Sequence, residues 1–134
     1  MRILSGSFSL ITARRMELID ITARVENILK ENICPDGLLY LFNPHTTAGL
    51  TINEGADLAV RQDICDGLRS FVPADYPFRH AEGNSPAHIM ATLCGSSLTI
   101  AISDGRLALG QWQHIFFGEF DGPRERFIHW RFLS

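Results

Sequence analysis

The sequence predicts an α+β protein with a largely antiparallel β-sheet or sandwich and two or three helices. Apolar residues recur every three or four positions in two segments, as on one face of a helix, and form short strand-like runs elsewhere. Turn signals such as Asp104-Gly105 and Asp121-Gly122-Pro123 separate the later runs, as between antiparallel neighbours. The chain has 134 residues, 46% of them apolar, and no linker or repeat divides it, so we expect a single domain over residues 1–134.

The beginning of the chain is expected to form two strands followed by a helix. Strand-like runs cover residues 3–11 and 16–21. From residue 21 to residue 33 apolar residues recur at helical spacing, and Asp20 or Thr22 is available as the N-cap. The Pro-Asp-Gly sequence that follows predicts a turn after this helix.

Two strands and a second helix are expected next. LLYLFN, residues 38–43, is a nearly continuous apolar run, which is typical of a strand buried on both faces. A further strand includes residues 50–52, and the apolar spacing predicts an amphipathic helix from about residue 56 to residue 71. A long polar loop over residues 73–84 follows.

A short third helix is predicted by its start and stop signals. Ser85 is placed as the N-cap and Pro86 as the first helical residue, and Gly95 is placed to end the helix. The remaining sequence is strand-like, in the runs SLTIAIS, LALGQWQHIFFGEF and RERFIHWRFL.

The strand-like run over residues 112–120 is apolar on both faces. Trp112, Phe116 and Phe120 share one face, while Ile115 and Phe117 share the other. Helices can cover one face, and a second sheet or another subunit can cover the other. This pattern predicts that the protein is not a monomer.

Composition limits the expected partners and location. The net charge of −3, without a block of like charges, argues against a nucleic-acid partner. The first apolar runs are too short and broken for a signal peptide or a membrane span, so a cytoplasmic protein without membrane contact is expected. Cys34, Cys65 and Cys94 form no CxxC pair and are expected to be small core residues rather than a disulfide or zinc framework.

One loop carries an unusual density of polar groups. His80, Glu82, Asn84 and His88 lie within nine residues, where the loop leads into a helix N-terminus. The free N–H groups and dipole there disfavour a charged imidazole, and a neutral imidazole can bind a metal or act as a base. Gly83 allows the bend that would bring His80 back to His88, although this spacing is no established zinc signature.

A third histidine from another segment would complete a metal site. His45 directly follows the LLYLFN strand, where a rigid element holds a side chain well, although it fits a turn histidine equally. Three histidines with one open position are the arrangement of a catalytic zinc site. Glu82 would be a fourth ligand, a general base, a partner that fixes an imidazole tautomer, or an ordinary loop carboxylate. His114 and His129, within strand patterns, are expected to fill core positions.

Two arginines after a tight turn suggest an anion site. Arg124 and Arg126 follow Asp-Gly-Pro, and a guanidinium group matches phosphate oxygens bidentately. Ser96 and Ser97 offer hydroxyl and backbone N–H donors. The alternative interpretation of both segments is a solvated turn.

Together these segments resemble one family. The motifs are HTTAGLTINE at 45–54, HAEGNSPAHI at 80–89, GSSL at 95–98 and GQWQHIFFGEFDGPRER at 110–126, in this order. From about residue 5 to residue 132, the chain resembles the YjbQ-like proteins, also named the secondary thiamine-phosphate synthase family.

The resemblance implies a small cytoplasmic α+β homotrimer with a polar pocket near a subunit boundary, in which the matched histidines bind a divalent metal. It also implies a weak ability to make thiamine phosphate from a pyrimidine diphosphate and a thiazole phosphate. The residues that match the family's pocket are His45, Asn53, Glu54, His80, Glu82, Gly83, Asn84, His88, Trp112, Gln113, Arg124 and Arg126. The chain departs from the family at Gln111, where threonine is common, and at Met90, where lysine is frequent.

The leading hypothesis is a metal-assisted enzyme that acts on a small phosphorylated metabolite. His45, His80 and His88 would hold Zn²⁺ or Mg²⁺, and Glu82 or Glu54 would move a proton. The other matched polar residues, together with Ser96 and Ser97, would bind substrate and phosphate. Imidazole ligands favour a softer metal than Mg²⁺, which pyrophosphate chemistry usually uses. Phosphoester hydrolysis and non-catalytic binding of metal or metabolite by a trimer therefore stay open.

Overall fold

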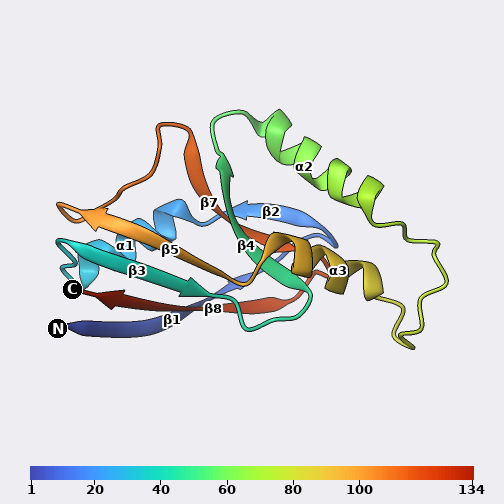
Figure 1. Ribbon diagram of the computed structural model, residues 1–134, viewed down its shortest axis with the longest axis horizontal. Helices are drawn as coiled ribbons and strands as arrows, with labels where there is room; N and C mark the ends of the chain where they lie inside the picture. The colour runs from blue at the N-terminus through green and yellow to red at the C-terminus, as the bar shows by residue number, and fades with distance from the viewer.

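Two antiparallel sheets and three helices form the structure, a computed structural model that describes residues 1–134 (Figure 1). The five-stranded sheet contains, in spatial order, β1 (Ile3–Ile11), β8 (Glu125–Leu133), β3 (Gly37–Phe42), β5 (Ser97–Ser103) and β6 (Arg106–Leu107). The three-stranded sheet contains β2 (Glu17–Asp20), β7 (Gln113–Glu119) and β4 (Ala48–Glu54). The predicted α+β class with antiparallel sheets is thus confirmed.

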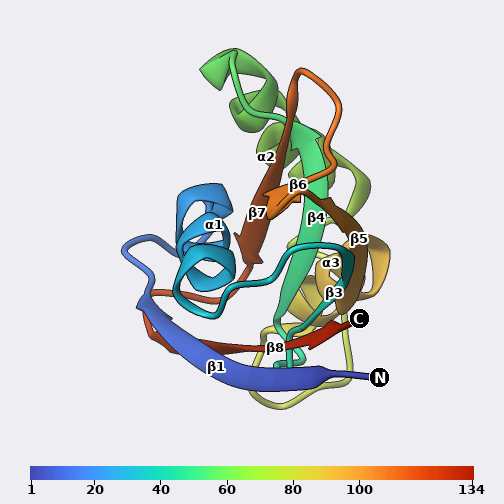
Figure 2. The ribbon, with the colours of Figure 1, turned by 90° about the vertical axis from the view of Figure 1, so that its left-hand side faces the viewer.

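The inner faces of the two sheets pack against each other and against the first helix, α1 (Thr22–Glu31). Figure 2 shows α1 beside β7, where it closes one side of the space between the sheets. Its Val25 and Leu29 are buried with Leu39 and Leu41 of β3 and with Phe117 of β7. Burial of these apolar side chains, at about 1.5–3 kcal/mol each, is the main stabilising contribution.

Strand β7 is buried on both faces, as the sequence predicts. Ile115 and Phe117 point into the core between the sheets. On the other face, Phe116 packs with Cys65 of α2 (Leu58–Phe71), and Phe120, just beyond β7, packs against α3 (Ser85–Cys94). Helices and a second sheet of the same chain therefore cover β7, and this strand gives no reason to expect another subunit.

Strand β3, in contrast, is buried on one face only, so the prediction of burial on both faces is wrong within this chain. Leu39 and Leu41 are fully buried, whereas Leu38 and Phe42 on the outer face are 49% and 37% exposed. The reason is that no helix packs over the outer face of the five-stranded sheet. His129 of β8, expected in the core, lies exposed on this same face.

The element boundaries follow local hydrogen bonds. Helix α2 begins at Leu58 rather than near residue 56, because the Asp57 carboxylate accepts the N–H of Ala59 at 2.9 Å. Helix α3 begins one residue earlier than predicted, with Asn84 at the N-cap, and it ends at Gly95, whose φ of 100° a glycine adopts without strain. The run before Gln113 is largely loop rather than strand.

None of the three helices is long and apolar enough to cross a membrane.

Candidate functional site

The three predicted histidines line one polar pocket of about 450 Å³. Its walls come from the β3–β4 connection, from the loop and first turns of α3, and from the turn and start of β8. The lining residues are Pro44, His45, Thr46, Thr47, His80, Glu82, Asn84, His88, Arg124 and Arg126. The structure thus brings together segments about 40 residues apart that carry seven of the residues selected from the sequence.

The turn that carries His45 is fixed by a buried asparagine. The Asn43 side chain accepts the backbone N–H of His45 at 3.0 Å and donates to the carbonyl oxygens of His45 and Ala48 at 3.2 and 2.8 Å. These bonds hold the chain as it leaves β3, so His45 stands on a rigid support.

The imidazole of His45 is oriented by a backbone group. Its Nε2 accepts the N–H of Phe127 at 2.9 Å, and its ring stacks on the Phe127 ring with centroids 6.3 Å apart. Burial, followed by the charge of Arg126, lowers the pKa of His45 below its ordinary value, which favours the neutral form. Nδ1 then carries the proton, so His45 presents a donor and has no free lone pair for a metal in this arrangement.

His80, Glu82 and His88 form the other side of the pocket. The rings of His80 and His88 are 5.4 Å apart between centroids and nearly perpendicular, and Nε2 of His80 is 4.0 Å from Oε2 of Glu82. The three side chains have the chemistry of a transition-metal site, but no three histidine, cysteine or acidic side chains are placed to hold one ion. The predicted three-histidine coordination is therefore not formed as the side chains stand.

Arg126 is part of a buried ion pair that the sequence interpretation missed. Arg126 and Glu119 are 2% and 0% exposed, and Nε and Nη2 of Arg126 both donate to the Glu119 carboxylate. Thr12 and the N–H of Asp121 also donate to Glu119, at 2.7 and 3.0 Å. Burial alone would raise the pKa of Glu119, but these hydrogen bonds hold it below its usual value.

The ion pair leaves one edge of Arg126 for the pocket. Nη2 also donates to Oγ1 of Thr47 at 2.9 Å, whereas Nη1 has no hydrogen-bond partner. A signal for this pair was present in the sequence, since a carboxylate inside the apolar run FFGEF requires a buried cation or donors.

Asp121 connects the second arginine to the start of α3. Arg124 donates from Nε to the Asp121 carbonyl oxygen at 2.9 Å and from Nη2 to its carboxylate at 3.1 Å. The same carboxylate oxygen accepts Nδ2 of Asn84 at 2.9 Å. Oδ1 of Asn84 is buried and has no hydrogen-bond partner.

Six further residues selected from the sequence lie outside this pocket. Asn53 and Glu54 end β4, roughly 20 Å along the strand from its start near His45. Oε2 of Glu54 accepts the N–H groups of Ala56 and Asp57, so Glu54 caps the loop before α2 and does not reach the histidines. The others are Trp112 and Gln113, which lie beside this loop, and Ser96 and Ser97, which lie at the start of β5.

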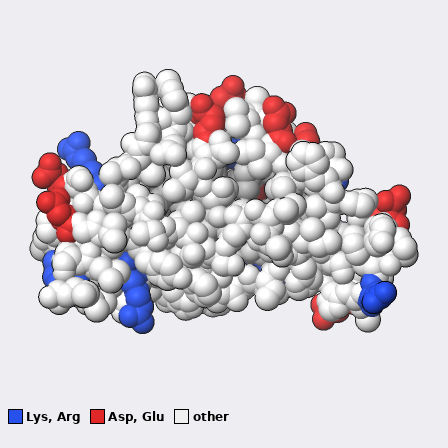
Figure 3. Space-filling model, viewed as in Figure 1, with Lys and Arg blue, Asp and Glu red and all other residues white.

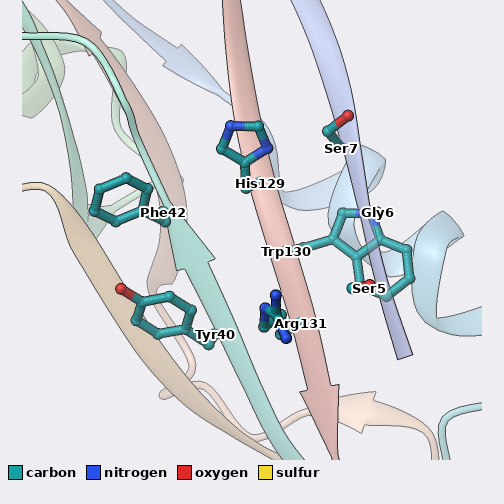
Figure 4. A pocket seen from close by; sticks show the side chains of 8 residues that line it. All are labelled: Ser5, Gly6, Ser7, Tyr40, Phe42, His129, Trp130 and Arg131. Atoms are coloured by element: carbon teal, nitrogen blue, oxygen red, sulfur yellow. The ribbon is translucent and has the colours of Figure 1, made fainter. Parts of the chain in front are cut away.

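Another cavity, of about 500 Å³, lies on the outer face of the five-stranded sheet (Figure 4). It combines Tyr40 and Phe42 of β3 with His129 and Arg131 of β8 and two serines of β1. These residues occupy alternate positions along their strands. The sequence analysis did not predict this cavity, because it expected both faces of β3 to be buried.

The fold and the pocket define a class: small α+β proteins in which two antiparallel sheets and a short helix carry a polar pocket. A family model described as "UPF0047 protein YjbQ-like" matches residues 6–134. The chain belongs to this YjbQ family, as its motifs indicated.

Relatives and solved structures agree with this assignment. The UPF0047 protein MJ1081 of Methanocaldococcus jannaschii is 50% identical over 86% of this chain and 83% of its own length. YugU of Bacillus subtilis is 45% identical over 86% of this chain and 88% of its own. A YbjQ-like protein of unknown function from Sulfolobus solfataricus superposes with a TM-score of 0.94 at 32% identity, covering 99% of this chain and 98% of that one. The YjbQ/UPF0047 protein of Clostridium acetobutylicum gives 0.92 at 46% identity, covering 96% and 99%.

Proposed function

We propose that the histidine pocket binds a small phosphorylated metabolite together with a divalent metal ion and hydrolyses the phosphoester. One observation carries the proposal: His45, His80, His88, Glu82 and two arginines line a single cavity of about 450 Å³. Phosphate needs fixed donors and positive charge, and the cavity supplies both.

The donors to phosphate would be Arg124, Arg126 and His45. Nη1 is unpartnered in both arginines, while their other nitrogens bind Asp121 or Glu119 and so fix the guanidinium planes. Nδ1–H of a neutral His45 would add a third donor, which its bond to Phe127 orients. Such preorganised donors stabilise the charge that develops on the transferring group.

The metal would be held by His80, His88 and Glu82. His80 and Glu82 lie on the loop before α3 with side chains 41% and 75% exposed, so both can rotate toward His88. Two imidazoles and a carboxylate suit Zn²⁺ better than Mg²⁺. When bound, such an ion polarises a phosphoryl oxygen and lowers the pKa of water. With its second carboxylate oxygen, Glu82 would take the proton of the attacking water and pass it to the oxygen of the departing alcohol.

A second candidate is a protein that binds the metabolite without turnover. Binding without turnover is favoured by one observation: no three histidine, cysteine or acidic side chains converge on a single point. Thiamine-phosphate synthesis should be assayed as a third possible function, because its diphosphate substrate would bind the same two arginines, Arg124 and Arg126.

We also propose that the protein assembles with copies of itself, as a homotrimer, through the outer face of the five-stranded sheet. Leu38, Tyr40 and Phe42 of β3 lie there beside Thr99 and Ala101 of β5. Figure 3 shows no Lys, Arg, Asp or Glu over the middle of this face, where β3 and β5 lie in Figure 1. Arg131 of β8 lies next to Tyr40 at the border of this apolar area. An exposed apolar area with polar residues at its border is typical of an interface.

Metal content and turnover test the function separately. After zinc supplementation and desalting, elemental analysis should find about one zinc ion per wild-type chain and much less in His88→Ala. His129→Ala is the matched control, because His129 lies on the outer sheet face and should leave zinc binding unchanged. Zinc below about a tenth of an equivalent in the wild type would rule out the metal part.

Turnover should then depend on Glu82. In a screen of phosphate esters with zinc, Glu82→Gln should keep substrate binding and lower kcat by about 10²–10⁴-fold. Saturable binding without turnover in the wild type would support the binding protein instead. Product from a pyrimidine diphosphate and a thiazole phosphate would support the synthase.

A further inference from the structure

A larger cavity, of about 720 Å³, lies between the β1–β2 connection and α2, outside the histidine pocket. Four arginines line it, namely Arg14, Arg15, Arg61 and Arg69, against one carboxylate, that of Glu17. This concentration of positive charge is notable in a chain with a net charge of −3.

Two of the four arginines have no carboxylate partner. The side chains of Arg14 and Arg61 form no hydrogen bond or ion pair, whereas Arg15 lies 3.6 Å from Asp121 and Arg69 donates to Asp66 of its own helix at 3.0 Å. Oε2 of Glu17 accepts the N–H groups of Ala13 and Arg14 at 2.7 and 2.8 Å, so this carboxylate holds the turn. An anion that enters the cavity would therefore meet two guanidinium groups without competing partners, those of Arg14 and Arg61.

Arg61 carries the strongest indication of a ligand. Its guanidinium carbon lies 4.9 Å from the centroid of the Phe116 ring, and its Nε is buried without any hydrogen-bond partner. Stacking on the ring fixes the guanidinium plane and leaves its N–H edges free. A buried donor without an acceptor is costly, and a bound anion would remove that cost.

The spacing along α2 suits more than one phosphoryl group. Arg61, Cys65 and Arg69 are four residues apart and share one face of the helix. Arg61 and Arg69 are separated by about 12 Å along the axis. Arg14 and Arg15 face them from the β1–β2 connection.

An apolar cavity of about 370 Å³ adjoins the arginine cavity and shares Arg15, Met16 and Arg69 with it. Its walls include Met90 and Phe120, and Asn84 also lines it. Oδ1 of Asn84 is buried without a partner, so it is an acceptor that needs a donor. The two cavities together match a ligand with an anionic end, an apolar body and an N–H or O–H group.

We propose that these joined cavities bind a nucleotide-like organic polyphosphate, with its phosphoryl groups on the arginines and its amino-bearing ring in the apolar cavity. The site requires no metal and is independent of the function proposed for the histidine pocket. It is therefore tested in EDTA, so that failure of one proposal leaves the other standing.

Isothermal titration with ATP and with inorganic tripolyphosphate tests the site. Arg61→Gln removes a charged hydrogen-bond donor, so it should weaken the binding of both ligands by about tenfold or more. Arg14→Gln should weaken them in the same direction, and because Arg14 is exposed and its side chain has no partner, this variant should remain folded. Arg106→Gln removes the same charge from β6, which lines neither cavity, and should change little.

Absence of tripolyphosphate binding at millimolar concentration would overturn the proposal. So would equal losses in Arg61→Gln and Arg106→Gln, because these would indicate general charge attraction. ATP should bind more tightly than tripolyphosphate, and equal affinities would overturn the placement of the organic part in the apolar cavity.

Discussion

Arg126 stabilises the protein interior and also lines the histidine pocket. Two of its nitrogens are bound to Glu119 in the protein interior, while Nη1 remains unpartnered at the pocket. A phosphate ligand would therefore meet a guanidinium whose position the fold has already fixed, with little loss of side-chain freedom on binding.

Replacing this arginine should destabilise the protein strongly. Arg126→Met leaves the buried Glu119 charge unpaired, which should cost about 3–5 kcal/mol in urea unfolding. Because the pKa of Glu119 is lowered in the folded state, the stability that this carboxylate contributes is fully present above its unfolded pKa and is lost as the pH falls from there through its folded pKa.

Matched variants separate burial from charge. Arg124→Met removes a half-exposed arginine and should cost less than about 1 kcal/mol. Glu119→Leu combined with Arg126→Met removes both charges and should recover much of the loss. Equal stability of Arg126→Met and the wild type would contradict the assigned role of the pair.

Among individual residues, about half of those selected from the sequence line the pocket together, but the sequence did not predict what these side chains can do. The motifs placed His45, His80, His88 and both arginines in one pocket, as the structure has them. The donor role of His45 depends on the backbone N–H of Phe127, 82 residues away in the sequence. That contact has no local signature in the sequence. The Glu119 carboxylate inside the apolar run FFGEF did indicate a buried partner, but it did not indicate which cation would supply it.

Helix α2 shows how one side chain sets an element boundary. Its amphipathic spacing predicted the helix, while the Asp57 cap determined that it begins at Leu58. Strand β3 shows the opposite case. A continuous apolar run does not indicate whether both faces of the strand are covered by the same chain, and in β3 one face is exposed.

The Asp57 cap can be tested directly. Asp57→Ala removes the bond to the N–H of Ala59 and should lower the free energy of unfolding by about 1 kcal/mol. Asp63→Ala, at an exposed position within α2, should stay within about 0.5 kcal/mol of the wild type. Similar effects of the two substitutions would show that Asp57 acts only through its charge.

The molecule as a whole has one protected and one open sheet face. Helices α2 and α3 cover the outer side of the three-stranded sheet, whereas the outer side of the five-stranded sheet carries exposed apolar side chains. The sequence predicted association from β7, whereas the structure favours β3, because β7 is covered on both faces and the outer face of β3 is not.

Association should therefore depend on β3. The wild type should have the mass of a trimer by light scattering at micromolar concentration, and Leu38→Glu should shift it toward the monomer while remaining folded. Phe71→Glu, at an exposed apolar position at the end of α2, should keep the wild-type mass. A monomeric wild type would remove the proposed interface.

Asn84 stands at the border of two cavities, since it lines both the histidine pocket and the apolar cavity. Its amide is joined through Asp121 to Arg124, which lines the histidine pocket. A compound that binds Oδ1 of Asn84 would act on the same short chain of hydrogen bonds as a phosphate on Arg124. If the first compound changes the affinity for phosphate by some factor, phosphate must change the affinity for the first compound by the same factor.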